Sequence, residues 1–236
     1  MIQYARKFSI LFFVVCLCIG LGACGKKTPQ ISQEKMLSLK KASVGDIITF
    51  GTYEQNNVLS DGKEDVDWIV LKKNGNKILI ISNKMLDLQP YHHANTEVTW
   101  ADCDLRAWLN SDFFNTAFSG SEKTIIAKTE IFTAGVGKHL AECTTKDKVF
   151  ILSKEEIIKF FPTKSSRRAS ATLYTKFKQA EDPDRSIASE WFSRTPSDYS
   201  GAQKFVYKDG SVDYGGASNT LKLGVRPCMW LDLDIS

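Results

Sequence analysis

The stretch VDWIVLKKNGNKILIIS, residues 66–82, contains two apolar runs separated by a short polar segment. The runs cover residues 66–71 and 77–82, and the segment between them includes Asn74 and Gly75. Both residue types tolerate positive φ angles, and Asn-Gly between two apolar runs is the strongest short-range signal for a tight turn between strands. The stretch therefore predicts an antiparallel β-hairpin.

Strand patterns also occur on both sides of this hairpin. Residues 46–53 have a β-like pattern of apolar and small polar side chains. Near the C-terminus, residues 204–208 and 211–214 flank an Asp-Gly pair, which predicts a second hairpin. Residues 225–231 predict a closing strand, in which Pro227 favours an edge or bulge position because proline cannot donate to a strand ladder.

Helical patterns occupy the middle of the chain. The apolar side chains that recur at helical spacing are Leu105, Trp108, Leu109 and Phe113. They predict a helix over residues 102–118, with Asp102 as its N-cap. A short helix is expected to open at residues 121–124, and residues 149–152 predict a buried strand before a capping box at residues 153–156. Strands at both ends with helices between them indicate an α+β fold rather than repeated βαβ units.

The first 24 residues have the pattern of a secretory signal. Arg6 and Lys7 precede an almost charge-free stretch, residues 8–20, and small residues then lead to Cys24. The apolar stretch is too short to be a comfortable membrane span.

The sequence LGAC, which ends at Cys24, resembles the lipobox of bacterial lipoproteins. The resemblance implies cleavage before Cys24 and attachment of a diacylglyceryl group, with fatty chains such as palmitate, to its thiol. Two acyl chains anchor a protein stably, whereas one gives only marginal binding. We therefore expect a lipoprotein signal peptide at residues 1–23, a lipidated cysteine and tether at residues 24–42, and an extracytoplasmic domain over residues 43–236. An ordinary cleaved signal and an uncleaved anchor are the alternatives.

The charge balance bears on the partners of this domain. The chain has 31 Lys and Arg residues and 27 Asp and Glu residues, and Arg6 and Lys7 leave with the signal, so the remainder is close to neutral. Nucleic-acid binding requires a concentrated basic face, and no basic run here is longer than two residues. No further apolar stretch approaches the roughly 18 residues of a membrane helix. We expect no nucleic-acid partner, and contact with the cell membrane or outer membrane through the lipid anchor alone.

Three cysteines remain after the lipid acceptor, namely Cys103, Cys143 and Cys228. They contain no CxxC spacing, so neither a zinc ribbon nor a thioredoxin-like motif is supported. In an oxidising compartment they are compatible with one disulfide and one thiol, or with three buried thiols.

Several segments, taken in order, resemble one bacterial family, the domain of unknown function 6273. They are residues 44–46, 50–53, 67–71, 98–100, 105–110, Phe113, 117–118, 147–153, 191–196, 209–212 and 224–227. The last three look like the end of C-type-lectin-like and formylglycine-generating-enzyme-like domains, which close with a Trp-containing strand, a hairpin and a Gly-x-Arg strand. The resemblance implies a single compact C-type-lectin-like domain. Ser193 and Thr195 depart from the family pattern near Arg194.

Candidate binding residues lie in this closing region. They are Trp191, Arg194, Tyr207, Tyr214 and Arg226. A guanidinium held over Trp191 or Trp230 would be a rigid donor for a carboxylate or sugar hydroxyls. The alternative is that the arginines form structural ion pairs with buried acids. Tyrosines in loops supply low-entropy contact surface for sugars or proteins, unless they belong to the core.

Metal and cofactor sites are not predicted. His92 and His93 are adjacent, and neighbouring side chains point in different directions in an extended chain, so they are expected to be a poor chelating pair. Formylglycine-generating chemistry would need two close cysteines near the C-terminus to hold copper, and only Cys228 lies there. The expected function is therefore a non-catalytic binding module for a glycan, peptide or partner protein. The alternatives are an oxidase-like enzyme of the formylglycine-generating type and a purely structural envelope protein.

Overall fold

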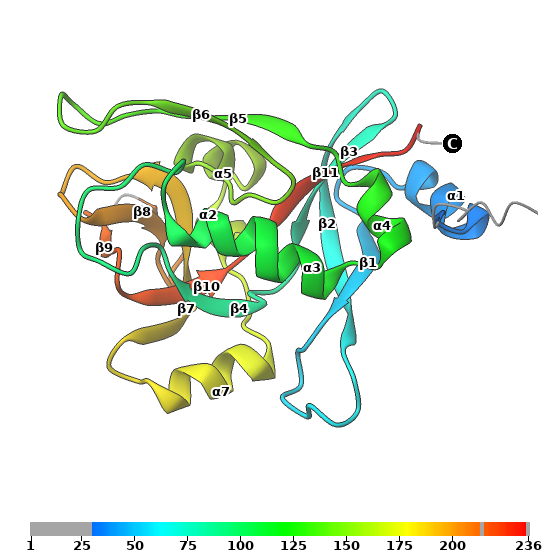
Figure 1. Ribbon diagram of the computed structural model, residues 1–236, viewed down its shortest axis with the longest axis horizontal. Helices are drawn as coiled ribbons and strands as arrows, with labels where there is room; N and C mark the ends of the chain where they lie inside the picture. Colours follow the sequence, from blue (N-terminus) through cyan, green and yellow to red (C-terminus); the bar gives the residue numbers. More distant parts are fainter. Residues whose placement is uncertain (1–29, 213–214, 235–236) are drawn as a thin grey trace, which may run out of the picture.

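Two sheets organise the chain in a computed structural model that describes residues 30–212 and 215–234 (Figure 1). Cys24 and Tyr214 lie outside the described residues, so the predictions for both remain predictions. None of the helices in the described part of the chain is long and apolar enough to cross a membrane. The architecture is mixed α+β with mostly antiparallel pairing, as the strand and helix patterns predicted.

The first sheet has the order β1–β2–β3–β11, and all its pairs are antiparallel. Its strands are β1 (Ile47–Tyr53), β2 (Glu64–Asn74), β3 (Lys77–Ser82) and β11 (Cys228–Asp232). The predicted hairpin is confirmed as β2 and β3, with Asn74 opposite Lys77. The turn residues are Gly75 and Asn76, one position later than expected, and Gly75 has a φ of 57°.

The second sheet has the order β4–β10–β7–β8–β9, in which only β10 and β7 are parallel. Its strands are β4 (Asp87–Pro90), β7 (Ser186–Pro196), β8 (Ala202–Val206), β9 (Ala217–Ser218) and β10 (Lys222–Val225). The predicted second hairpin is present at its turn, where the Gly210 N–H donates to the Tyr207 carbonyl at 2.7 Å and the Tyr207 N–H donates to the Ser211 carbonyl at 2.8 Å. Residues 211–212 do not form a strand, and residues 213–214 of the predicted hairpin lie outside the described residues. The start of β8 pairs with β9.

The predicted closing strand is two strands in two different sheets. β10 ends at Val225 and β11 begins at Cys228, so the chain passes from the second sheet to the first through Arg226 and Pro227. Pro227 has no N–H to donate, and its carbonyl accepts a hydrogen bond from Ser82 N–H at 2.9 Å. The predicted strand at residues 149–152 is reduced to a single bridge between Phe150 and Cys228.

The predicted long helix is a continuous helical run that begins two residues later than expected. It consists of α2 (Asp104–Trp108), a π-helical turn η1 (Leu109–Phe113) and α3 (Phe114–Ala117). Its N-cap is Cys103, whose Sγ accepts from the Arg106 N–H at 3.4 Å. Asp102 does not cap the helix, because its carboxylate accepts instead from the Thr99 hydroxyl at 2.8 Å.

The remaining elements surround the two sheets. The helices are α1 (Gln33–Lys41), α4 (Gly120–Ile125), α5 (Lys154–Phe160), α6 (Lys164–Arg167) and α7 (Leu173–Glu181), and the strands are β5 (Thr129–Thr133) and β6 (Cys143–Asp147). The β5–β6 hairpin runs along one long side of the molecule, and α7 lies on the opposite side (Figure 1). The predicted capping box of α5, Ser153 with Glu156, is confirmed.

Helix α1 packs on the domain although its residues fall within the expected tether. Leu39 and Ala42 are buried, and the Lys35 ammonium lies 2.6 Å from the Glu122 carboxylate on α4. Lys73 of β2 donates to the Ala42 carbonyl at 2.6 Å. The packed domain therefore begins before residue 43, the boundary expected from the sequence.

Candidate functional site

A groove of about 470 Å³ opens between β5, α5 and one face of the first sheet. The floor on the sheet side is a row of three side chains from neighbouring strands. Lys72 of β2 is opposite Leu79 of β3, and Leu79 is opposite Trp230 of β11, so all three project from the same face. Antiparallel register thus places an aliphatic, an aromatic and a cationic side chain side by side.

The two walls of the groove add further aromatic surface. Phe132 on β5 is 54% exposed, although it is a large apolar side chain. Phe160 at the end of α5 is partly buried against the core, and Phe150 closes the groove below. Exposed aromatic groups that line a concave surface are typical of binding sites.

Charged groups of both signs line the groove beside these apolar side chains. Lys72 and Lys159 supply positive charge, and Glu130 and Glu155 supply negative charge. The groove is therefore an apolar surface edged by mixed charge, suited to holding a ligand that carries both apolar and charged groups.

Arg194 lies at the base of the groove and joins its two walls. The guanidinium donates to the Phe132 carbonyl of β5 at 3.2 Å and to the Glu156 carboxylate of α5 at 2.6 Å. It also donates to the Ile151 carbonyl at 2.8 Å. Arg194 thus lines the groove, and it also forms the ion pair that the sequence analysis gave as the alternative to ligand binding.

Arg226 occupies a different environment, between the two sheets. Its guanidinium lies 4.8 Å from the Trp191 ring and 5.3 Å from the Phe161 ring, and donates to the Ser82 carbonyl at 2.9 Å. Burial lowers the pKa of Arg226 to about 10, so the side chain is still a cation at neutral pH. Its Nη1 is buried without a hydrogen-bond partner in residues 30–212 and 215–234.

The four predicted binding residues within the described range do not converge on one surface. Trp191 and Arg226 are 1% and 2% exposed, so they offer no area to a ligand, because they fill the space between the sheets. Tyr207 is half-buried beside Phe205, with a ring-centroid distance of 6.2 Å. Among these four described residues, only Arg194 lines the groove.

The three cysteines in the described range are not bridged. Burial raises the pKa of the Cys103 thiol to about 12 and that of the Cys228 thiol well above its usual range. Neither thiol is therefore a thiolate at neutral pH, and a thiolate is the form that attacks substrates or binds metals. Cys143 is half-buried at the start of β6.

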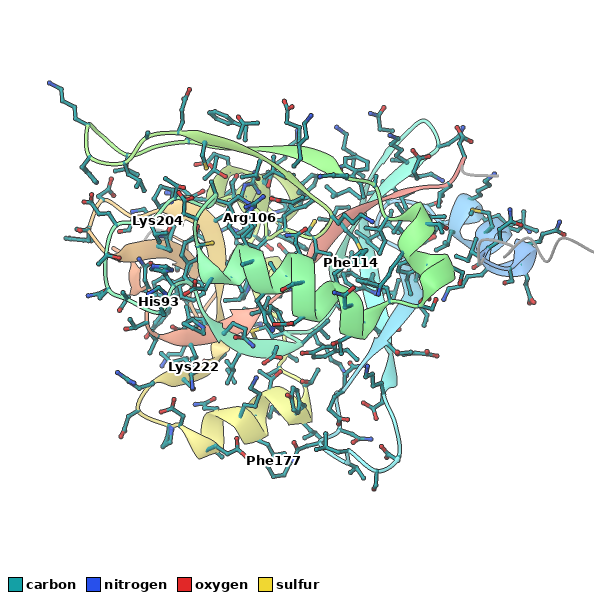
Figure 2. All side chains as sticks on the ribbon, in the orientation of Figure 1. His93, Arg106, Phe114, Phe177, Lys204 and Lys222 are labelled. Carbon is teal, nitrogen blue, oxygen red and sulfur yellow. The ribbon has the colours of Figure 1, made fainter. Side chains whose placement is uncertain are left out.

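A cluster of metal-ligating side chains lies elsewhere, beside the start of α2 (Figure 2). The Asp104 Oδ2 lies 3.1 Å from His92 Nδ1 and 2.7 Å from His93 Nδ1, and the two imidazole ring centroids are 4.1 Å apart. The prediction that these histidines point apart is wrong, because they lie in a bend after β4 rather than in an extended strand. The third member of the cluster, Asp104, lies eleven residues after His93 and was not identified from the sequence.

One comparison with known proteins gives a match. The family described as Domain of unknown function (DUF6273) matches residues 75–233, which is more than half of the chain. The segments before residue 75 that resembled this family fall outside the match. No curated protein and no solved structure matches the chain. The chain therefore belongs to the DUF6273 family.

Proposed function

We propose that this chain is a lipoprotein, anchored through Cys24 on the extracytoplasmic side of a membrane, whose domain is a non-catalytic module that binds a peptide segment of a partner protein. The groove between β5 and α5 is the proposed binding site. The observation that carries this proposal is the exposed Phe132 beside Trp230 in a concave, largely apolar surface. Aromatic side chains of this kind provide much of the binding energy in protein interfaces.

A peptide fits the groove better than a glycan does. A sugar requires several hydrogen-bonding groups that are free to contact its hydroxyls. At the groove base, Arg194 already donates to Ile151, Phe132 and Glu156. The remaining surface offers apolar contact, with Lys72 and Glu130 available to pair with charged side chains of a peptide. We also propose that the domain is C-type-lectin-like, because residues 191–227 resemble the end of such domains. That fold commonly serves as a binding scaffold, which favours a binding role.

The anchor contributes to the proposed function by raising effective concentration. A domain held at a membrane meets ligands of that surface repeatedly, so contacts of modest affinity are enough. We expect Cys24→Ala to release the protein from the membrane fraction. Retention of Cys24→Ala in the membrane, with unchanged gel mobility, would contradict lipidation.

Peptide binding is tested with a matched pair of phenylalanine variants of the full chain, purified in detergent. A random peptide library displayed on phage is selected on the wild-type protein, and the affinities of the enriched peptides are measured by fluorescence titration. Phe132→Ala is expected to weaken binding at least about tenfold, the effect of a residue that contributes about 1.4 kcal/mol or more. Phe177→Ala is the control, because Phe177 is 52% exposed on α7, away from the groove (Figure 2).

Two outcomes would overturn the peptide proposal. One is an equal loss of affinity in the Phe177→Ala control. The other is a glycan array on which the wild-type protein binds sugars through Phe132 while no peptide is enriched.

A further inference from the structure

We infer that His92, His93 and Asp104 form a binding site for one Zn²⁺ ion, separate from the proposed peptide groove. The three side chains come from the bend after β4 and the first residue of α2. Figure 2 shows His93 close to the start of α2, on the part of the molecule that carries the second sheet. The three residues lie within the range that the family model matches, but the family description gives them no role, and they do not line the proposed peptide groove.

The distances between the ligand atoms suit a small ion. One ligand atom from each of the three residues lies within 4.8 Å of the others. The Asp104 Oδ2 lies 3.1 Å from His92 Nδ1 and 2.7 Å from His93 Nδ1. Ligand atoms bound at about 2.0–2.1 Å around a tetrahedral Zn²⁺ are roughly 3.3 Å from one another. Small side-chain rotations therefore convert the observed cluster into a coordination shell.

An unsatisfied nitrogen points to a missing partner at this place. His92 Nδ1 is buried without a hydrogen bond, although the Asp104 Oδ2 lies 3.1 Å away, because that contact lacks hydrogen-bond geometry. The His92 side chain is only 14% exposed, so water has little access to compensate. Buried polar atoms are nearly always satisfied in folded proteins. A metal ion in front of this nitrogen would use its lone pair.

The backbone holds the ligands in position before any ion binds. The His92 N–H donates to the Asn219 carbonyl at 3.0 Å, which fixes the bend against the loop between β9 and β10. The His93 N–H donates to the Asp104 Oδ2 at 2.7 Å. Asp104 is itself fixed as the first residue of α2, after the Cys103 cap. A site with ligands pre-positioned from two sides needs little reorganisation on binding.

The chemistry of the donor set selects the ion. Two imidazole nitrogens favour Zn²⁺ over Ca²⁺ and Mg²⁺, which prefer oxygen ligands alone. Asp104 adds a carboxylate oxygen, a ligand that Zn²⁺ accepts together with imidazole nitrogens. Three protein ligands leave one position of a tetrahedral shell open for water.

The test is a titration of the full chain in detergent with Zn²⁺, in which isothermal calorimetry measures the heat of binding. The wild-type protein is expected to bind one Zn²⁺, with no comparable heat from Ca²⁺ or Mg²⁺. His93→Ala is expected to weaken zinc binding at least about tenfold, in line with the losses seen when the surroundings of metal sites are disturbed. This variant should fold normally, because the His93 side chain is 74% exposed. His139→Ala removes the third histidine of the chain and is expected to bind zinc as the wild type does.

Cobalt substitution distinguishes this site from the cysteines. Co²⁺ bound by nitrogen and oxygen ligands gives visible absorption bands without the intense near-ultraviolet charge-transfer band of a thiolate complex. The site is wrong if the wild-type protein binds no zinc, if His93→Ala binds it unchanged, or if the thiolate band appears.

Discussion

Helices α4 and α5 begin with the same local motif in two different surroundings. In each, a serine caps the helix and a glutamate three residues later accepts a hydrogen bond from the serine N–H at 2.9 Å. The pairs are Ser119 with Glu122 and Ser153 with Glu156. Each glutamate also binds a distant cation at 2.6 Å: Lys35 of α1 contacts Glu122, and Arg194 of β7 contacts Glu156.

The two ion pairs differ in which member is buried. At α4 the Glu122 side chain is 11% exposed and the Lys35 side chain 35%. At α5 the order is reversed, because the Glu156 side chain is 36% exposed and the Arg194 side chain 5%. A buried polar group left without partners costs far more than an exposed one. The buried member of the ion pair therefore contributes most to stability in each case. It is the acid Glu122 at α4 and the cation Arg194 at α5.

The largest effect is expected for Arg194→Ala. The substitution removes donors to the Ile151 and Phe132 carbonyls as well as the ion pair with Glu156, and should lower the free energy of unfolding by about 3 kcal/mol. Glu156→Ala should cost less, about 2 kcal/mol, because it removes the helix cap and the acid that pairs with buried Arg194, which keeps its two carbonyl acceptors. Urea unfolding of both variants measures the difference. Equal losses of stability in the two variants would contradict the conclusion that Arg194 contributes more to folding than Glu156.

The second prediction is that Glu122→Ala lowers the free energy of unfolding by about 2 kcal/mol. The substitution removes the helix cap and the acceptor of the buried Gly51 N–H, which lies 3.1 Å from the Glu122 Oε1 in the wild-type protein. Lys35→Ala should cost about 0.5 kcal/mol, because a part-exposed ammonium contributes little. Urea unfolding again provides the measurement. A larger loss in Lys35→Ala than in Glu122→Ala would reverse the proposed roles.

These two motifs also show what the sequence could predict. Ser153 and Glu156 were identified in advance, because the capping pattern followed directly after an apolar run. Ser119 and Glu122 have the same spacing, but the helix was expected to open at Ser121, so the box was missed. The spacing itself was sufficient evidence in both cases. The tight turn at Gly75 was predictable for a similar reason, since its signal is local.

Features that depend on distant pairing were not predictable. Arg226 and Pro227 look like the middle of one strand, and only the pairing of their neighbours with two different sheets separates β10 from β11. Phe132 has an ordinary strand context, and its exposure arises because β5 pairs with β6 rather than joining either larger sheet. The Arg194 ion pair joins residues 38 positions apart. The groove results from these long-range contacts.

The smallest effect is the pH dependence of stability at α4. Burial alone would raise the pKa of Glu122, but hydrogen bonds from Lys35, Ser119 and Gly51 outweigh it and lower that pKa. A carboxyl whose pKa is lower in the folded state stabilises the protein above its unfolded pKa of about 4.3. This stabilisation is lost as the pH falls through the folded value.

Wild-type stability should therefore fall more steeply below about pH 5 than that of Glu122→Gln, which has no carboxyl to titrate at this position. Urea unfolding at a series of pH values measures both slopes. Glu34→Gln, which neutralises an exposed carboxylate on α1, is the matched control and should follow the wild type. If Glu122→Gln also follows the wild type, the Lys35–Glu122 contact contributes nothing to folding. The packing of α1 would then depend on the burial of Leu39 and Ala42 and on the Lys73 hydrogen bonds to the end of the helix, and only the α5 motif would use its distant ion pair.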